Sequence, residues 1–211
     1  MKKTILSSIT GLLALALLFI SLSGCGPKYR YVYPTMKQYS PYFQNADHAY
    51  RGKRILLNDI YNYATNTSVN GFFSENNSVF YDTGSLTSFT WYALKKAFQS
   101  VGMRVYAAND GVTDKINKAI GFEKRKINAP SGTPALQVTI MSLNDIEGVF
   151  TTTLTGTDGR IFKHEFKVHI PRVNSKALNN AALEKRSFKL MSNLVSEILK
   201  NKKFQEVFLR Q

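Results

Sequence analysis

The chain has 211 residues, of which 44% are apolar and 12% aromatic, a composition that allows a buried core and excludes a disordered chain. Its single cysteine excludes a disulfide within the chain. The formal net charge of +14 favours anionic partners such as phospholipid headgroups, lipopolysaccharide phosphates or acidic cell-wall polymers, although lysines that merely solvate the surface would explain it equally.

The N-terminus has the order of a secretory signal. Lys2 and Lys3 give a positive start, and an apolar run follows over residues 11–20. The run leads to Leu22-Ser23-Gly24-Cys25, which matches the Leu-small-small-Cys lipobox of bacterial lipoproteins. We therefore predict that residues 1–24 are a cleaved signal peptide and that Cys25 is acylated on its thiol and on its freed amine. A retained transmembrane helix is the alternative, but the apolar segment is short for one.

The predicted anchor sets the expected location and partners. Two or more acyl chains hold a protein stably on a membrane. Gly26 follows the cysteine in place of Asp, which by resemblance to the enterobacterial sorting rule implies the outer membrane. We expect the domain to face the periplasm, with display on the cell surface as the alternative. Loss of Lys2 and Lys3 leaves 26 − 14 = +12 charges, and export makes nucleic acid an unsuitable partner.

Residues 25–50 are predicted to be the lipid anchor and a tether rich in tyrosine and proline. Prolines interrupt regular structure at Pro27, Pro34 and Pro41, and five tyrosines lie among them. Two arrangements fit these tyrosines. They can lie among the lipid headgroups, or they can pack on the domain as an extended arm.

Residues 51–211 are predicted to form a single domain, which opens as β-α-β. Residues 54–60 have the apolar pattern of an interior strand, and the polar stretch 61–88 is expected as a long loop that contains a hairpin at residues 71–73 and 79–81. A helix over 88–100, capped by Ser85 or Thr87 and ended by Gly102, leads to a strand over 103–107.

The remainder of the domain is predicted to add antiparallel strands and a long helix. The pattern indicates a short helix over 112–120, a charged loop over 123–126, and strands over 135–146, 149–155 and 160–170. Gly156-Thr157-Asp158-Gly159 supplies a hairpin turn. A helix capped by Asn174 or Ser175 extends to about residue 200, and a shorter segment covers 203–209. The predicted class is α+β, with one mixed sheet and two main helices on one of its faces.

No residue pattern indicates catalysis, a cofactor or a metal. The three histidines, His48, His164 and His169, lack a second ligand at metal-binding spacing, and His164 and His169 point to opposite faces of one strand. His164 has the parity of the apolar residues, which favours a histidine in the core or at a sheet edge. Asp145 and Glu147 are spaced as a carboxylate pair, but they fall where a hairpin should turn. We expect the protein not to be an enzyme.

Three segments carry a resemblance to the YajG-like outer-membrane lipoproteins: the helix and strand over 91–105, the strand over 136–140, and the tail over 199–208. The order of elements is also similar to that of the auxiliary lipoproteins of ABC transport systems, LptE and the LpoB and CsgG type domains. The chain departs from the YajG-like pattern by a longer loop before the first helix, an insert near 109–133 and a shorter hairpin. The resemblance implies an envelope lipoprotein without catalytic residues.

Three functions remain from these observations. The first is a non-enzymatic accessory lipoprotein that docks on a larger envelope assembly through the loop 61–88 or the basic surface. The second is a module that binds lipid or lipopolysaccharide in an apolar groove between sheet and helices, with lysines at its rim. The third is an undetected hydrolase.

Overall fold

A computed structural model describes residues 30–32, 37–41, 43, 48–68, 71–73, 78–81, 85–107, 129–173 and 179–210. The folded domain lies within residues 31–211. Several predictions lie outside the described residues: the lipobox Leu22, Ser23 and Gly24, the lipidation site Cys25, the helix 112–120, the charged loop 123–126, and the caps Asn174 and Ser175.

The domain is built on a mixed five-stranded sheet in the order β6-β2-β7-β8-β9. Its strands are β2 (Arg54–Asn62), β6 (Arg104–Ala107), β7 (Ala135–Leu143), β8 (Glu147–Thr155) and β9 (Ile161–His169). Strand β2 is parallel to β6 and β7, whereas β7, β8 and β9 are antiparallel to their neighbours. The predicted β-α-β opening and the antiparallel strands after it are confirmed.

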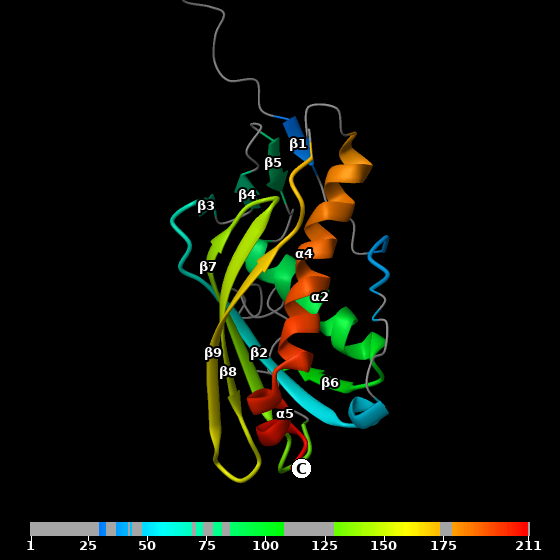
Figure 1. Ribbon diagram of the computed structural model, residues 1–211, viewed down its shortest axis with the longest axis vertical. Helices are drawn as coiled ribbons and strands as arrows, with labels where there is room; N and C mark the ends of the chain where they lie inside the picture. Colours follow the sequence, from blue (N-terminus) through cyan, green and yellow to red (C-terminus); the bar gives the residue numbers. More distant parts are fainter. Residues whose placement is uncertain are drawn as a thin grey trace, which may run out of the picture. The chain divides into compact units, whose positions relative to one another are not determined.

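The helices pack on one face of this sheet (Figure 1). Helix α2 (Leu86–Ser100) begins where the Ser85 side chain accepts a hydrogen bond from the Ser88 amide, so Ser85 is the cap. The helix ends as predicted at Gly102, whose φ of 85° is left-handed. The amides of Gly102 and Met103 bond back to the carbonyls of Gln99 and Phe98 at 3.0 and 3.2 Å, which completes a glycine cap.

The long C-terminal helix begins later than predicted. Helix α4 spans Asn180–Lys200, and Asn179 caps it by accepting a hydrogen bond from the Ala182 amide at 2.9 Å. Asn179 is thus the cap of this helix in place of the predicted Asn174 or Ser175, because it stands closer to the apolar stripe. Helix α5 (Lys202–Phe208) follows directly, since Asn201 ends α4 and caps α5.

Side chains from both layers fill the space between the sheet and the helices. Full burial of one large apolar side chain, such as Leu or Phe, stabilises the fold by about 1.5–3 kcal/mol relative to leaving it in water. The sheet contributes Ile55, Leu57, Leu136, Val138, Ile140, Phe150 and Leu154, and the helices contribute Trp91, Leu94, Phe98, Leu190, Leu194, Val195 and Ile198, all nearly inaccessible.

A second, smaller sheet has the order β1-β5-β4-β3. Its strands are β1 (Arg30–Val32), β3 (Thr67–Ser68), β4 (Gly71–Phe73) and β5 (Ser78–Tyr81). The antiparallel pair β4–β5 is the hairpin predicted within the loop 61–88. Strands β1 and β3 were not expected.

Residues from the expected tether belong to the domain core. Val32, Tyr39 and Tyr50 are buried, and Tyr50 ends a short 3-10 helix, η1 (His48–Tyr50). The Tyr39 ring stacks on Phe188 at 4.8 Å, and its hydroxyl lies 2.9 Å from the Ser192 hydroxyl. Of the two arrangements left open for the five tyrosines of the tether, Tyr39 adopts the one that packs on the domain.

Candidate functional site

Three exposed side chains form a patch on the open face of the five-stranded sheet, where β2 ends. They are Tyr61, Tyr63 and Met141, with exposed fractions of 43%, 69% and 41%. The rings of Tyr61 and Tyr63 stack with their centroids 6.3 Å apart. These three residues are called the Tyr–Met patch. Tyrosine and methionine are enriched at protein interfaces, so the patch is a candidate docking site.

A bulge in β2 turns the tyrosines outward. Leu57 lies opposite Leu136 of β7. Two residues further along β7, Val138 lies opposite Ile60, so β2 has one residue more in this interval. Buried positions are thus odd-numbered before the bulge and even-numbered after it. Strict alternation would have placed Tyr61 in the core, and the bulge places it on the open face instead.

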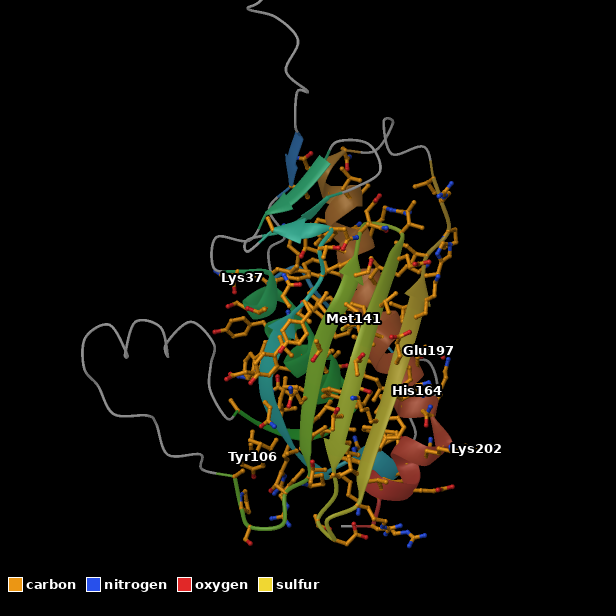
Figure 2. The ribbon with its side chains drawn as sticks, turned by 90° about the vertical axis from the view of Figure 1, so that its left-hand side faces the viewer. Lys37, Tyr106, Met141, His164, Glu197 and Lys202 are labelled. Carbon is orange, nitrogen blue, oxygen red and sulfur yellow. The ribbon has the colours of Figure 1, made fainter. Side chains whose placement is uncertain are left out.

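A second bulge brings Met141 to the same region. Ile140 lies opposite Phe150 of β8, and Ser142 lies opposite the adjacent residue, so Met141 is the extra residue of β7. On the side of β7 that faces β2, the Tyr63 amide donates to the Ile140 carbonyl at 2.9 Å, which places Tyr63 beside Met141. Figure 2 shows Met141 on the open face, with the helices behind the sheet. Bulges that redirect side chains are enriched next to functional sites.

Side-chain hydrogen bonds hold the backbone beyond the patch. The Asn62 carbonyl oxygen Oδ1 accepts from the Ala64 amide at 3.1 Å, and its Nδ2 donates to Thr67 at 3.0 Å. Asn66 exchanges two hydrogen bonds of 3.3 Å with the backbone of Leu143. The patch is therefore presented by an ordered backbone, which lowers the entropy lost when a partner binds.

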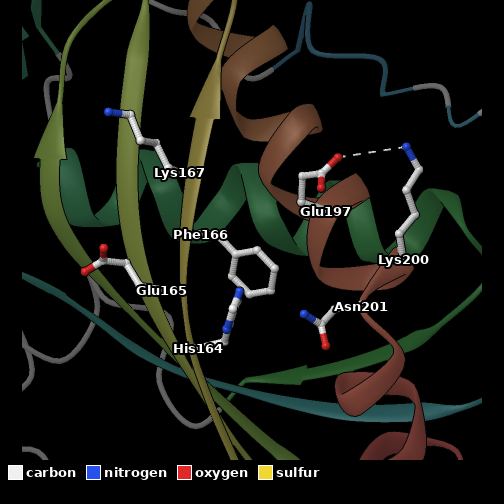
Figure 3. A pocket seen from close by; sticks show the side chains of 7 residues that line it. All are labelled: His164, Glu165, Phe166, Lys167, Glu197, Lys200 and Asn201. Atoms are coloured by element: carbon white, nitrogen blue, oxygen red, sulfur yellow. Dashed lines mark ion pairs between the residues drawn. The ribbon is translucent and has the colours of Figure 1, made fainter.

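A second surface feature is a pocket of about 250 Å³ between β9 and the end of α4. Figure 3 shows Phe166 and His164 on the α4 side of β9, and Glu165 and Lys167 on the other side. The pocket is lined by His164, Glu165, Phe166, Lys167, Glu197, Lys200 and Asn201. Glu197 and Lys200 form an ion pair at 3.9 Å. This lining is mainly polar and differs from an apolar lipid groove.

The histidines do not come together. His164 is exposed at the sheet edge, with its ring 4.7 Å from Phe166, so it has the expected place for an edge histidine. His169 is exposed on the opposite parity, as predicted, and its carbonyl accepts from Asn193 at 3.1 Å. His48 begins η1. Among the described residues, no group of three or more His, Cys, Asp or Glu is placed to hold a metal ion.

The carboxylates of Asp145, in the turn after β7, and Glu147, the first residue of β8, pair with different basic side chains. Asp145 is buried and lies 3.9 Å from Nε of Arg186 in α4, while Nη2 of Arg186 donates to the Asp145 carbonyl at 3.2 Å. Glu147 lies 3.1 Å from Nζ of Lys167 in β9. Asp145 therefore joins the turn to α4, and Glu147 joins β8 to β9.

Part of the basic surface lies where β2 and β6 begin. Arg54 is opposite Arg104 in the parallel pairing, and the Arg104 amide donates to the Lys53 carbonyl at 2.8 Å. Arg51 lies against Gly102, where an added Cβ would be 3.3 Å from its Cγ. Arg51 and Arg104 are exposed, so this end of the sheet presents positive charge.

In the described core, side chains from both layers, such as Phe150 of the sheet and Leu194 of α4, are fully buried and belong to one hydrophobic cluster. Within the same described part of the chain, no helix combines the length and apolar character needed to cross a bilayer.

Comparison with known proteins gives a distant likeness to solved structures. No family model matches the chain, and no curated protein matches it significantly. The fold resembles that of the lipoprotein GNA1162 from Neisseria meningitidis with 18% identity and a TM-score of 0.34, over 71% of this chain and 98% of that one. A likeness this distant identifies neither a family nor a function. The YajG-like resemblance therefore stays a prediction.

The Tyr–Met patch was not predicted from the sequence. The available signal was the pair Tyr61 and Tyr63 at alternating positions directly after an apolar strand. That pattern is equally typical of buried residues until the bulge is known.

Proposed function

We propose that the chain is a bacterial lipoprotein, held on the outer membrane through acylated Cys25, and that it acts as a non-enzymatic docking component of an envelope assembly. The observation that carries the anchor is the lipobox Leu22-Ser23-Gly24-Cys25 behind a charged start and an apolar run. Cys25 is also the single cysteine of the chain, so its thiol has no structural disulfide to form.

The Tyr–Met patch is the proposed docking site for a protein partner. Its three side chains are exposed, so an interface that buried them would remove large apolar areas from water. Asn62 at the end of β2 and Asn66 after it fix the backbone that presents them, so little ordering is required on binding. The patch also lies at the start of the segment 61–88, from which the contact was expected.

The docking site is tested by photo-crosslinking in cells that make the full chain. A photoreactive phenylalanine derivative replaces Tyr63, and in a matched control it replaces Tyr106 of β6. We expect one defined protein to be crosslinked from position 63 and not from position 106. An absence of crosslinks from position 63, or the same crosslinks from both positions, would contradict the proposed site.

A second set of variants tests the composition of the patch. Tyr61→Ser and Met141→Ser should each reduce the crosslink from position 63, because both side chains border it. Substitutions of exposed residues usually change the free energy of unfolding by no more than about 0.5 kcal/mol. The folded fraction should therefore remain that of the parent. An unchanged crosslink in both variants would remove the patch as the docking site.

A further inference from the structure

Strand β9 is an edge of the five-stranded sheet within the described part of the chain. It is nine residues long, and its pairing with β8 has no register shift. The pocket beside it is lined by residues 164–167, so the middle of the edge is open to solvent (Figure 3). A long, regular and accessible edge is suited to pairing with another strand.

The direction of the backbone groups of β9 follows from hydrogen bonds at its two ends. The Gly156 amide donates to the Arg160 carbonyl at 2.8 Å, and the Ile170 amide donates to the Ile146 carbonyl at 2.8 Å. The backbone N–H and C=O groups of the even-numbered residues therefore point toward β8, because hydrogen-bonded pairs alternate in an antiparallel ladder. The odd-numbered residues 161, 163, 165 and 167 point their N–H and C=O groups outward. The outward carbonyl of His169 is already bound to Asn193.

The side chains along the edge alternate in charge. Lys163, Glu165 and Lys167 share the open face of the sheet. Lys167 is bound to Glu147 of β8 at 3.1 Å. Among the described residues, Lys163 and Glu165 have no ion-pair partner, so one positive and one negative charge remain at the centre of the edge.

We propose that the β9 edge pairs with the β9 edge of a second copy of this chain, antiparallel and around a two-fold axis at His164. In this register Lys163 lies opposite Glu165 of the second copy, and the symmetry repeats the pair on the other side of the axis. Opposite charges directly across an antiparallel pair stabilise it. The exposed Ile161 lies opposite the aliphatic stem of Lys167, which covers part of its apolar surface.

Pairing with the two-fold axis at Glu165 or at Phe166 is less favourable than pairing with the axis at His164. An axis at Glu165 would place this carboxylate opposite its own copy and Lys163 opposite Lys167, and like charges in these positions are destabilising. An axis at Phe166 would require hydrogen bonds from His169, whose carbonyl is bound to Asn193. The charges and the free backbone groups therefore select the axis at His164. The resulting interface is isologous, as expected for a closed dimer.

Cysteine crosslinking of the full chain tests the axis. In His164→Cys the two residues 164 form a non-hydrogen-bonded pair, with Cα atoms about 4.5 Å apart, which is within the range for a disulfide. We expect mild oxidation of cells to give a covalent dimer of this variant. Thr157→Cys, at the exposed tip of the β8–β9 hairpin, is the matched control and should remain monomeric. The parent chain, with Cys25 alone, sets the background.

Charge exchange in the His164→Cys background tests the register. Lys163→Glu and Glu165→Lys should each weaken dimerisation about tenfold, because each creates two like-charge pairs. The double variant should recover the parental yield, since it restores both pairs with the charges exchanged. Lys185→Glu, an exposed change of equal charge on α4, should have no effect.

Three results would overturn the proposal. The first is the absence of a dimer from His164→Cys under conditions that oxidise exposed thiols. The second is an equal yield from Thr157→Cys. The third is a covalent product with a different protein in place of a second copy, which would assign the β9 edge to that partner.

Discussion

The hydroxyl of Tyr50 donates a 2.6 Å hydrogen bond to the carbonyl of Leu199, so the segment before the first long strand is tied to the last turn of α4. The Tyr50 ring also lies 5.8 Å from the Phe208 ring of α5. The same carbonyl accepts a second bond, of 2.8 Å, from Gln205. Tyr50 thus joins the N-terminal part of the domain to both C-terminal helices.

Tyr50→Phe should lower the free energy of unfolding by about 1 kcal/mol, the net value of one buried hydrogen bond. The loss stays small because Gln205 continues to satisfy the Leu199 carbonyl. Tyr50→Ala should cost about 3–5 kcal/mol, because it also leaves a cavity. Urea unfolding measures both, and Tyr61→Phe on the open face is the control. Equal losses for Tyr50→Phe and Tyr50→Ala would contradict this account.

Tyr39 should make stability depend on pH in the alkaline range. Burial raises the pKa of Tyr39 from 10.0 to about 12, against a smaller lowering by the hydrogen bond with Ser192. In the unfolded chain the phenol ionises near pH 10, so between pH 10 and 12 the unfolded state loses the proton that the folded state retains. The stabilisation is complete below pH 10 and is lost as pH rises to 12, by about 2–3 kcal/mol.

The comparison that isolates this effect is with Tyr39→Phe. The variant has no phenol to ionise, so its stability should fall less steeply over the same range. Parallel curves for the two proteins between pH 10 and 12 would show that Tyr39 ionises equally in both states.

Arg186→Ala should destabilise the domain by about 3 kcal/mol, because it removes the cation that lies beside the buried Asp145. The substitution also removes the hydrogen bonds to the carbonyls of Asp145 and Pro171. Lys189→Ala, exposed on the same helix, should change stability by less than about 0.5 kcal/mol. Denaturant unfolding of the two variants decides the matter. A similar small change in both would mean that the ion pair contributes nothing.

Gly102→Ala should destabilise the domain by about 1–2 kcal/mol, because alanine is strained in the left-handed conformation at this position. The added Cβ would also approach the Arg51 side chain at 3.3 Å. Gly102→Asn should cost less, since asparagine tolerates this conformation better. Thermal unfolding of both variants gives the order, and an alanine variant as stable as the parent would contradict the glycine cap.

The large sheet and its helices could be predicted because their residues repeat at a clear period. Buried positions alternate along β8, along β7 as far as Ile140 and along β9 except at His164, and Gly102 and Ser85 have capping roles that depend on local chemistry alone. By contrast, β1 and β3 have three and two residues. Segments this short contain no readable period, so they were not predicted.

The candidate site could not be predicted, because it depends on register. Tyr61 has the parity of the buried Ile55 and Leu57, and only the bulge before Ile60 moves it to the open face. A bulge is set by the pairing of β2 with β7, which is about eighty residues away in the sequence. In the same way, Tyr39 suits either a headgroup layer or a core, and its place is decided by the distant Phe188 and Ser192.

The central claim is that fatty acids on Cys25 hold the domain at a membrane, and metabolic labelling tests it most directly. Cells that make the full chain, the Cys25→Ser variant or the control Ser23→Ala, which keeps a small residue in the lipobox, are fed labelled palmitate and then fractionated. We predict that the parent and Ser23→Ala take up label and remain with the membranes. The Cys25→Ser variant should take up none and leave the membrane fraction. An unlabelled parent, or a serine variant that stays on the membranes like the parent, would contradict the account.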